Sequence, residues 1–425
     1  MEKLLVVFIV LTLGATSFIS ILSLPASSDS SKSLGDSSNL NVLDTDNSHI
    51  VEGVPYVSQE IDGYCFYAAV TMVLQYYGIN TTLKEILHHS GVGYTLFYNH
   101  KYDLVKNQPI FSEPSYFRYP LPELLFCQSI SNMIELASLF NLGINYWLPD
   151  QNTCSIELNW GEYWSRVKEN ITNNIPLITS VNVKYFPYAN ISSGHTVVIV
   201  GFNQTHVFYN DPATALFSKP EDGFYANMSI DIFQKAVNST PGTKFFVSTF
   251  KNNSNINYNK AEVFEKAHER NIKRLKGFFT ENYLSINFGI NAVKLFRNDF
   301  RIGPLHRMFT VRRNWDLYKQ NGSLDGLFNL ISKERHNVSQ YLLGNSDLSP
   351  KICTYDGSLL ENESKHWKNI AIYAIEFENI AKKYGYWTAS ILSISITRKM
   401  KSELNEIISI EKAIIHGPSY TAYEN

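Results

Sequence analysis

The segment Ser193–Pro212 reads SGHTVVIVGFNQTHVFYNDP and decides our interpretation of the fold. Two runs rich in β-branched and aromatic residues, one from His195 and one from His206, are typical of strands, and the polar residues between them are typical of a turn. The pattern predicts an antiparallel hairpin. If the turn centres on Asn203, facing residues have numbers that sum to about 406, which places Asp211 directly opposite His195.

A histidine beside a carboxylate supplies the base and the orienting group of a nucleophilic triad. The predicted nucleophile is Cys65, near the start of the apolar run Tyr64–Tyr77, which predicts a buried helix ended by Gly78. The helix dipole and the backbone N–H groups of a first helical turn would stabilise a thiolate there, and Asp62-Gly63 would form the capping turn. A buried, inert cysteine and a structural histidine are the alternatives.

Thiol chemistry on an acyl group also needs donors for the developing oxyanion. Gln59 precedes the predicted helix, so its amide could return to the thiol, and the backbone N–H of Cys65 would be the second donor. A polar turn residue is the alternative for Gln59, and His206 is a weaker candidate for the base. The adjacent His88 and His89 and the scattered acids lack metal-ligand spacing, so we predict no metal site and no cofactor.

The rest of the first half predicts an α+β fold, with helices first and strands later. Segment Gly91–Phe126 contains four prolines and is predicted to be an ordered loop. Further helices are expected over Thr82–His89, Ser129–Phe140 and Trp160–Asn173. Strands are expected over Pro176–Val183, His195–Phe202, His206–Tyr209 and Lys244–Phe250.

The chain changes character beyond Asn252. The Asn-rich residues 252–260 predict a linker between a domain over 51–251 and an all-α domain over 261–425. Residues 1–250 carry 12 Lys/Arg and 21 Asp/Glu, whereas 251–425 carry 25 and 18, and this reversal also indicates two modules. The basic half has no Lys/Arg block, which argues against nucleic-acid binding. Helical spacing is visible in Ala261–Phe279, Ile286–Phe300, Leu324–Leu343, Trp367–Tyr384 and Ile391–Ile415.

The N-terminus indicates export. Lys3 precedes an uncharged run from Leu4 to Leu24, and a polar linker over 27–50 follows, so residues 1–26 are predicted to be a signal peptide or a membrane anchor. Ten Asn-x-Ser/Thr sequons agree with an extracytoplasmic glycoprotein, secreted or anchored at the outer face of a membrane. Of the four cysteines, Cys127 and Cys154 are the favoured disulfide pair, because both lie in the first domain.

Several of these motifs together resemble one peptidase family. The motifs are VPYVSQ at Val54–Gln59, Cys65, MVLQYYG at Met72–Gly78, GHTVVIVG at Gly194–Gly201, and Asn210-Asp211-Pro212. In this order they resemble the papain-like domain of bacteriocin-processing, double-glycine leader peptidases.

The resemblance implies a papain-like cysteine-protease fold, followed here by the all-α domain. It implies Cys65 as the nucleophile and His195 as the base. It also implies Asp211 as the orienting group and Gln59 as the oxyanion donor. The chain departs from the family by having CFYAA at Cys65–Ala69, where the family usually has CGPA, and by its long insertion around 91–126.

A second resemblance covers these departures. The motifs SGVGYTLFY at Ser90–Tyr98 and VKYFPY at Val183–Tyr188, with a helical domain after the papain-like one, resemble the butirosin-biosynthesis acyltransferase N-terminal domain family. Its members use the same thiol machinery to move an acyl group to an amine. Export argues against an acyl-carrier substrate, since such carriers are cytoplasmic.

We therefore expect a secreted thiol-dependent peptidase or amidase that acts on a peptide or amide through an acyl-thioester intermediate. Amine acyltransfer is the alternative, and the aromatic segments Tyr94–Tyr98 and Tyr185–Tyr188 would then wall an acceptor pocket. A catalytically inactive binding module is the third hypothesis.

Overall fold

The computed structural model describes residues 48–61, 63–94, 96–99, 102–103, 108–109, 116–118, 126–148, 156–189, 191–240, 244–251, 259–277, 286–299 and 326–417. All of them belong to one compact unit, Asp46–Asn425. The predicted signal segment and most of both predicted linkers lie outside these residues, so the expected domain boundaries stay predictions. Among the described helices, none has the length and apolar character needed to cross a membrane.

A seven-stranded antiparallel sheet forms the framework of the first half, as predicted. Its strand order is β10-β9-β8-β7-β11-β6, and β1 also pairs with β8. The β8 strand is buried at every residue except the first, because its nearly continuous apolar run packs inside the core. The strands are β1 (His49–Ile50), β6 (Gly143–Trp147), β7 (Leu177–Asn182), β8 (Gly194–Phe202), β9 (His206–Asn210), β10 (Ala226–Ser229) and β11 (Val247–Lys251).

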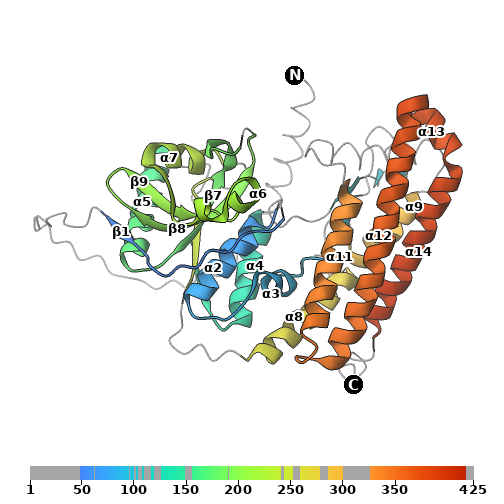
Figure 1. The fold of residues 1–425 in the computed structure, drawn as a ribbon, viewed down its shortest axis with the longest axis horizontal. Coiled ribbons are helices and arrows are strands. Elements are labelled where there is room, and N and C mark those ends of the chain that lie inside the picture. The colour runs from blue at the N-terminus through green and yellow to red at the C-terminus, as the bar shows by residue number, and fades with distance from the viewer. Residues whose placement is uncertain are drawn as a thin grey trace, which may run out of the picture. The chain divides into compact units, whose positions relative to one another are not determined.

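Helices pack against this sheet (Figure 1). The apolar helix α2 packs against β7 and β8, and ten of its residues are buried. Helices α5 and α7 also pack against β7, and α3 follows α2 directly. The predicted helices of the first half are all present, within a few residues at each end. Their bounds are α2 (Cys65–Tyr76), α3 (Leu83–His89), α4 (Phe126–Leu139), α5 (Ile156–Thr172), α6 (Thr214–Phe217) and α7 (Ile230–Asn238).

The register of the β8–β9 hairpin differs from the prediction. Val198 pairs with Asn210 and Phe202 pairs with Val207, so facing numbers sum to 408 or 409 rather than 406. The turn lies later than Asn203, and a bulge between Ile199 and Gly201 adds one further residue. Asp211 is therefore not directly opposite His195. It follows the last residue of β9.

Short strands occur where the sequence predicted a loop and a helix. Within 91–126, β2 (Phe97–Asn99) pairs with β5 (Tyr116–Arg118), and β3 (Tyr102–Asp103) pairs with β4 (Gln108–Pro109). Residues predicted to begin a helix at Ile286 form β12 (Ile286–Phe288), which pairs with β2. The apolar residues of β12 are too few for periodicity to distinguish a strand from a helix.

The described residues of the C-terminal half are helical apart from β12, as predicted. Its buried apolar side chains form a second hydrophobic cluster, in which Trp367 is fully buried. Arg335 lies in this core and forms ion pairs with Glu363 at 2.7 Å and Glu411 at 2.9 Å. The helices are α8 (Lys260–Lys276), α9 (Gly289–Asp299), α11 (Gly326–Gly344), α12 (Pro350–Tyr384), α13 (Tyr386–Leu392) and α14 (Ile394–Ile415).

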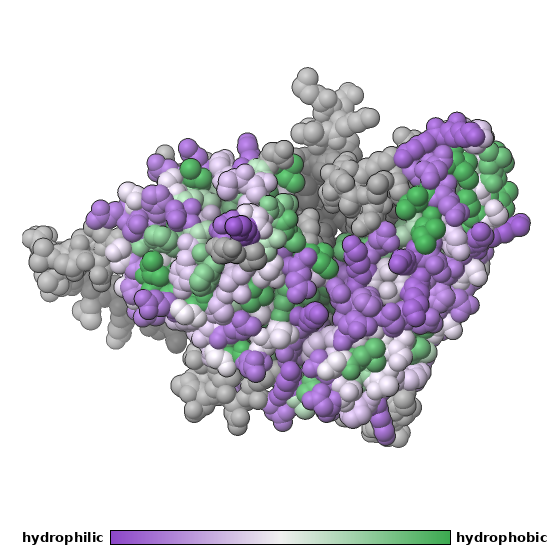
Figure 2. Space-filling view, in the orientation of Figure 1, coloured by the Kyte–Doolittle hydropathy of each residue, from purple (hydrophilic) through white to green (hydrophobic). Residues whose placement is uncertain are grey.

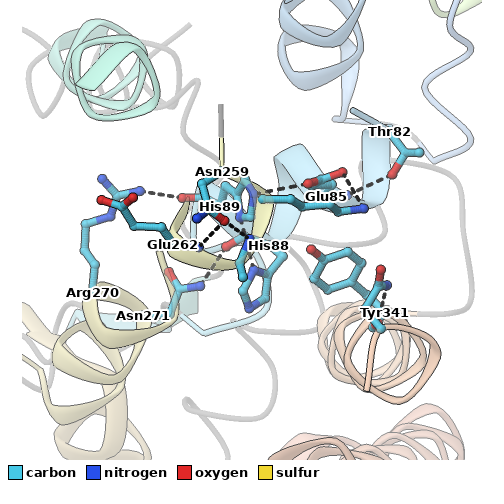
Figure 3. A network of polar contacts seen from close by, with 12 residues as sticks. Thr82, Glu85, His88, His89, Asn259, Glu262, Arg270, Asn271 and Tyr341 are labelled. Carbon is cyan, nitrogen blue, oxygen red and sulfur yellow. Dashed lines mark hydrogen bonds and ion pairs between the residues drawn. The ribbon is translucent and has the colours of Figure 1, made fainter. Parts of the chain in front are cut away.

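A buried polar network connects α3 with α8 (Figure 3). Arg270 Nη2 donates to the carbonyl oxygen of His89 at 2.6 Å, and Asn271 Nδ2 donates to that of His88 at 2.7 Å. The ring of His88 stacks on that of His268, with centroids 5.8 Å apart. Burial, aided by the neighbouring histidines and arginines, lowers the pKa of His88 well below its ordinary value, so the ring is neutral.

The loop after α3 passes very close to the C-terminal helices. Gly91 has φ +79°, and a Cβ atom there would lie 2.2 Å from Nη1 of Arg274 in α8. Gly93 has φ +80°, and a Cβ atom there would lie 3.1 Å from the carbonyl oxygen of Glu334 in α11. Glycine fits both positions because it has no Cβ and tolerates positive φ. The SGVGY motif is therefore a packing motif between α3 and the second half.

Candidate active site

The structure brings His195 and Asp211 together at the end of the β8–β9 hairpin. Nε2 of His195 lies 2.7 Å from Oδ1 of Asp211, and both side chains are buried. The two-residue difference from the predicted register keeps Asp211 on the side of the hairpin that His195 occupies, because side chains alternate with a period of two. The predicted pair is thus formed, but by diagonal neighbours.

Three donors surround the carboxylate of Asp211. Besides His195, the hydroxyl of Tyr188 donates to Oδ2 at 2.6 Å and the backbone N–H of Ala213 donates to Oδ1 at 2.9 Å. Burial alone would raise the pKa of Asp211, but the charge and hydrogen bond of His195, together with the other two donors, hold this pKa below its ordinary value. Asp211 is therefore a carboxylate at neutral pH and can orient the imidazole.

The main chain around Asp211 is also fixed. Its backbone N–H donates to the carbonyl oxygen of Gly223 at 2.8 Å, and its own carbonyl oxygen accepts from the hydroxyl of Tyr56 at 3.0 Å. The N–H of Gln59 donates to the carbonyl oxygen of Pro212 at 3.0 Å. These bonds attach the segment before α2 to the segment after β9, and so place Gln59 near the His195–Asp211 pair.

Tyr188 is a site residue that the sequence did not predict in this role. Burial first, and then the charge and hydrogen bond of Asp211, raise its pKa, so the phenol is protonated and acts as a donor. Its ring stacks on Phe217 of α6, with centroids 4.9 Å apart. The sequence placed Tyr188 in the VKYFPY motif and in a candidate acceptor-pocket wall, without a role toward Asp211.

Cys65 is the first residue of α2, as predicted, and is buried. Electrostatic interaction with Cys65 is the smallest of the causes that raise the pKa of Tyr188, so the thiol lies near the Asp211 cluster. The N-cap residue is Tyr64, whose side chain makes no capping hydrogen bond. Asp62 of the predicted capping turn lies outside the described residues, while Gly63 has the positive φ, +92°, of a tight turn.

The ring nitrogen Nδ1 of His195 is not the one that bonds to Asp211. Because Nε2 is bonded to Asp211, Nδ1 is the atom that can exchange a proton with a thiol. Phe186 packs edge-on against the imidazole, with ring planes at 90° and centroids 5.7 Å apart. The ring is therefore held by a carboxylate at one edge and an apolar contact on another side.

Gln59 is buried in front of α2. Its side-chain oxygen Oε1 is also buried and has no hydrogen-bond partner among the described residues. A buried amide oxygen without a partner is uncommon in folded proteins. This oxygen can only accept a hydrogen bond, so the proposed oxyanion role would fall to the Nε2 donors of the same amide.

The other candidates lie elsewhere. His206 bonds to the hydroxyl of Thr205 at 2.8 Å, at the turn of the hairpin and thus at the end opposite to His195 and Asp211. His88 and His89 belong to the buried polar network between α3 and α8 (Figure 3). Within the described part of the chain, no cluster of three or more His, Cys, Asp or Glu side chains could hold a metal.

The sequence also drew attention to the remaining cysteines and to Tyr94. Cys353 is a buried thiol in the second core, and the expected Cys127–Cys154 disulfide lies outside the residues whose side chains are described. Tyr94 is fully buried in the second core, where it packs against His88 and His268, so it does not wall an open pocket.

The described fold of the first half is that of a papain-like cysteine peptidase domain, with helices beside an antiparallel sheet. Residues 51–240, less than half of the chain, match the model of the family described as Peptidase_C39 like family, and this match indicates a cysteine-peptidase type of function. No curated protein matches the sequence. The crystal structure of a Bacillus anthracis protein provisionally described as a C39-like peptidase aligns over 100% of its own length and 49% of this chain, with 17% identity and a TM-score of 0.29.

Proposed function

We propose that the C39-like domain is a thiol-dependent peptidase or amidase in which Cys65 is the nucleophile, His195 the base and Asp211 the orienting group. The buried hydrogen bond between His195 and Asp211 is the observation that carries this proposal. An isolated structural histidine would not require a carboxylate that is itself held ionised by two further donors.

The first half of the proposed reaction uses these three residues. Nδ1 of His195 takes the thiol proton of Cys65, and the thiolate attacks the carbonyl carbon of the substrate to form a C–S bond. The oxygen that becomes negative accepts hydrogen bonds from the Gln59 amide and the Cys65 backbone N–H. The C–N bond then breaks as the imidazolium of His195 gives its proton to the leaving amine, which leaves an acyl-thioester.

Water completes the reaction. His195 takes a proton from a water molecule, whose oxygen attacks the thioester carbon. The C–S bond breaks, the acid leaves, and the imidazolium returns its proton to Cys65. Asp211 stabilises the imidazolium in both halves because its carboxylate stays ionised.

The substrate and location belong to the same proposal. A peptide or amide fits the chemistry of the C39-like domain. The uncharged run from Leu4 to Leu24 supports export, so the enzyme would act outside the cytoplasm, secreted or anchored at the outer face of the membrane.

A hydrolysis assay with an activated ester and a peptide amide tests this proposal. Wild-type protein should release free acid, and both Cys65→Ala and His195→Ala should lose turnover, whereas Cys353→Ala, which removes the other described thiol, should retain it. Retained turnover in Cys65→Ala would reject the nucleophile. A folded wild-type protein without turnover or thiol reactivity would support an inactive binding module instead.

Acyl transfer to an amine is the second candidate function. One observation favours it: the SGVGY motif of the acyltransferase resemblance is packed tightly against α8 and α11, so the helical half is joined to the domain that carries Cys65. Adding a primary amine at millimolar concentration to the ester assay distinguishes the two candidates. Free acid as the main product supports hydrolysis, and amide as the main product supports transfer.

A further inference from the structure

The end of the C-terminal helical hairpin extends past its neighbouring helix. Phe328, two residues after the start of α11, stacks on Trp367 of α12 with centroids 6.2 Å apart. From Trp367, α12 continues to Tyr384, a distance of about 25 Å at 1.5 Å per residue. Figure 1 shows this end of α12, together with α13, beyond the end of α11.

Large apolar side chains are exposed on this end. Tyr384 is 49% exposed, Ile391 47% and Leu392 56%, and Ile394 at the start of α14 is also exposed. Figure 2 shows hydrophobic and hydrophilic side chains next to one another here. Large apolar side chains grouped on one surface indicate an interaction site.

The charge on the same segment has one sign. Residues 379–402 contain five Lys or Arg and no Asp or Glu, whereas the whole chain contains 37 and 39. The remaining residues carry 32 basic and 39 acidic side chains, so this segment is positive although the chain as a whole is not. The basic residues are Lys382, Lys383, Arg398, Lys399 and Lys401, and all but Lys401 are classed as exposed.

Basic and apolar side chains alternate along this surface. Ile394 and Arg398 are four residues apart and thus lie on the same face of α14. The ammonium of Lys383 lies 5.0 Å from the centre of the Tyr384 ring, and that of Lys399 lies 5.4 Å from the ring of Tyr373. Long basic side chains of this kind can keep their charge in the headgroup region while nearby apolar side chains enter the lipid.

We propose that this hairpin end, residues 379–402, docks on the surface of a bilayer rich in anionic phospholipid. Local positive charge is attracted to the negative surface potential, and the exposed apolar side chains insert at the boundary between headgroups and acyl chains. A protein partner fits less well, because the centre of a protein interface is depleted in lysine, whereas lysines here lie among the apolar residues. The docking is peripheral and does not rest on the proposed peptidase activity.

Lysine acetylation of the full chain tests this docking at residue resolution. Vesicles of phosphatidylglycerol and phosphatidylcholine should slow the acetylation of Lys382, Lys383 and Lys399, and vesicles of phosphatidylcholine alone should not. Lys266 and Lys273 of α8 are internal controls, since both are more than half exposed and far along the chain from the hairpin. Their acetylation rates should not change.

Two variants with matched controls isolate the apolar and the charged contributions. Ile391→Ser with Leu392→Ser should abolish the protection, whereas Ile232→Ser, an exposed apolar residue of α7, should retain it. Lys382→Glu with Lys399→Glu should weaken vesicle binding by at least about fivefold for each charge lost. The same reversal at Lys266 and Lys273 should not.

The outcomes that overturn the proposal are specific. Unchanged acetylation of the hairpin lysines with anionic vesicles would reject it, and equal protection of the α8 lysines would show nonspecific adsorption. Protection that rises with protein concentration in the absence of vesicles would show that a second copy of the chain covers this surface instead. The N-terminal segment is the same in every variant, so it cannot produce a difference between them.

Discussion

The hydroxyl of Tyr188 donates a 2.6 Å hydrogen bond to Oδ2 of Asp211, on the carboxylate whose other oxygen holds His195. Tyr188 lies before β8 and Asp211 lies after β9, so this bond closes the open end of the hairpin. It also means that both oxygens of the buried carboxylate have a donor. Tyr188 is therefore a positioning residue, acting on the imidazole through Asp211.

Tyr188→Phe should slow the reaction of Cys65 without abolishing it. The substitution removes one charge-assisted hydrogen bond, worth about 1.5–3 kcal/mol, and should raise the pKa of Asp211. The rate of Cys65 alkylation should fall by about tenfold, on the order of 1.4 kcal/mol. The acidic side of the pH–rate profile for Cys65 alkylation should move to higher pH, because Asp211 in the variant is protonated at a higher pH than in the wild type.

Tyr185→Phe is the matched control, because Tyr185 lies in the same aromatic loop and is not one of the described donors to the Asp211 carboxylate. Its alkylation rate and pH profile should be those of the wild type. If both variants lose rate equally with unchanged profiles, Tyr188 only supports the packing of the loop.

Asp211 should make a pH-dependent contribution to stability. Its folded-state pKa is below the unfolded value of about 3.9, so its ionisation stabilises the fold above that pH and the contribution is lost as the pH falls through the folded-state pKa. The difference in unfolding free energy between wild type and Asp211→Asn, measured by urea denaturation, should shrink between pH 5 and pH 3. A difference that is constant or grows on acidification would contradict the depressed pKa.

The packing of the loop after α3 against α8 can be tested at Gly91. Gly91→Ala should destabilise the protein both through its positive φ, about 1–2 kcal/mol, and by displacing Arg274 from its ion pair with Glu135. Gly78→Ala is a matched control, since Gly78 has φ +82° but nothing within 4 Å of an added Cβ. Thermal unfolding should show a larger fall in the unfolding midpoint for Gly91→Ala than for Gly78→Ala. Equal falls would mean that the close approach of Gly91 to Arg274 does not affect stability.

Limited proteolysis should cut first within residues 252–260. Because α3 and its following loop pack against α8 and α11, the two fragments should stay associated until they are denatured. Mass spectrometry of the fragments over time locates the cut. Cuts confined to residues 27–50 would instead show that the two halves form one inseparable core and would favour the acyltransferase hypothesis.

The fold of the first half could be predicted because its strongest elements are long and uninterrupted. The apolar runs that form α2 and β8 are recognisable by pattern alone, since each is buried over nearly its whole length. The strand β6 was missed because it is partly exposed and contains Asn145 beside apolar residues, and β10 because it has four residues. Short elements owe their structure to the strands they pair with, which local sequence does not record.

The site was predictable in its residue types and less so in its geometry. Side chains alternate between the two faces of a strand, and this alternation placed His195 and Asp211 on one side of the hairpin. A register error of two residues does not change the side on which each residue lies. The bulge after Ile199 was missed, although Gly201 lies at its end and an isolated glycine inside a strand pattern is a signal for a bulge. The role of Tyr188 depends on the path of an irregular loop, and the close approach at Gly91 depends on a helix nearly 200 residues later in the chain.

Selective alkylation of Cys65 tests the central claim most directly. With iodoacetamide at pH 6, Cys65 should react faster than Cys353, because the imidazole of His195 and the start of α2 favour a thiolate, whereas burial raises the pKa of Cys353 to about 11. His195→Ala should remove this selectivity. Equal labelling of the two thiols, or no labelling of Cys65 in the folded protein, would contradict a nucleophile at Cys65.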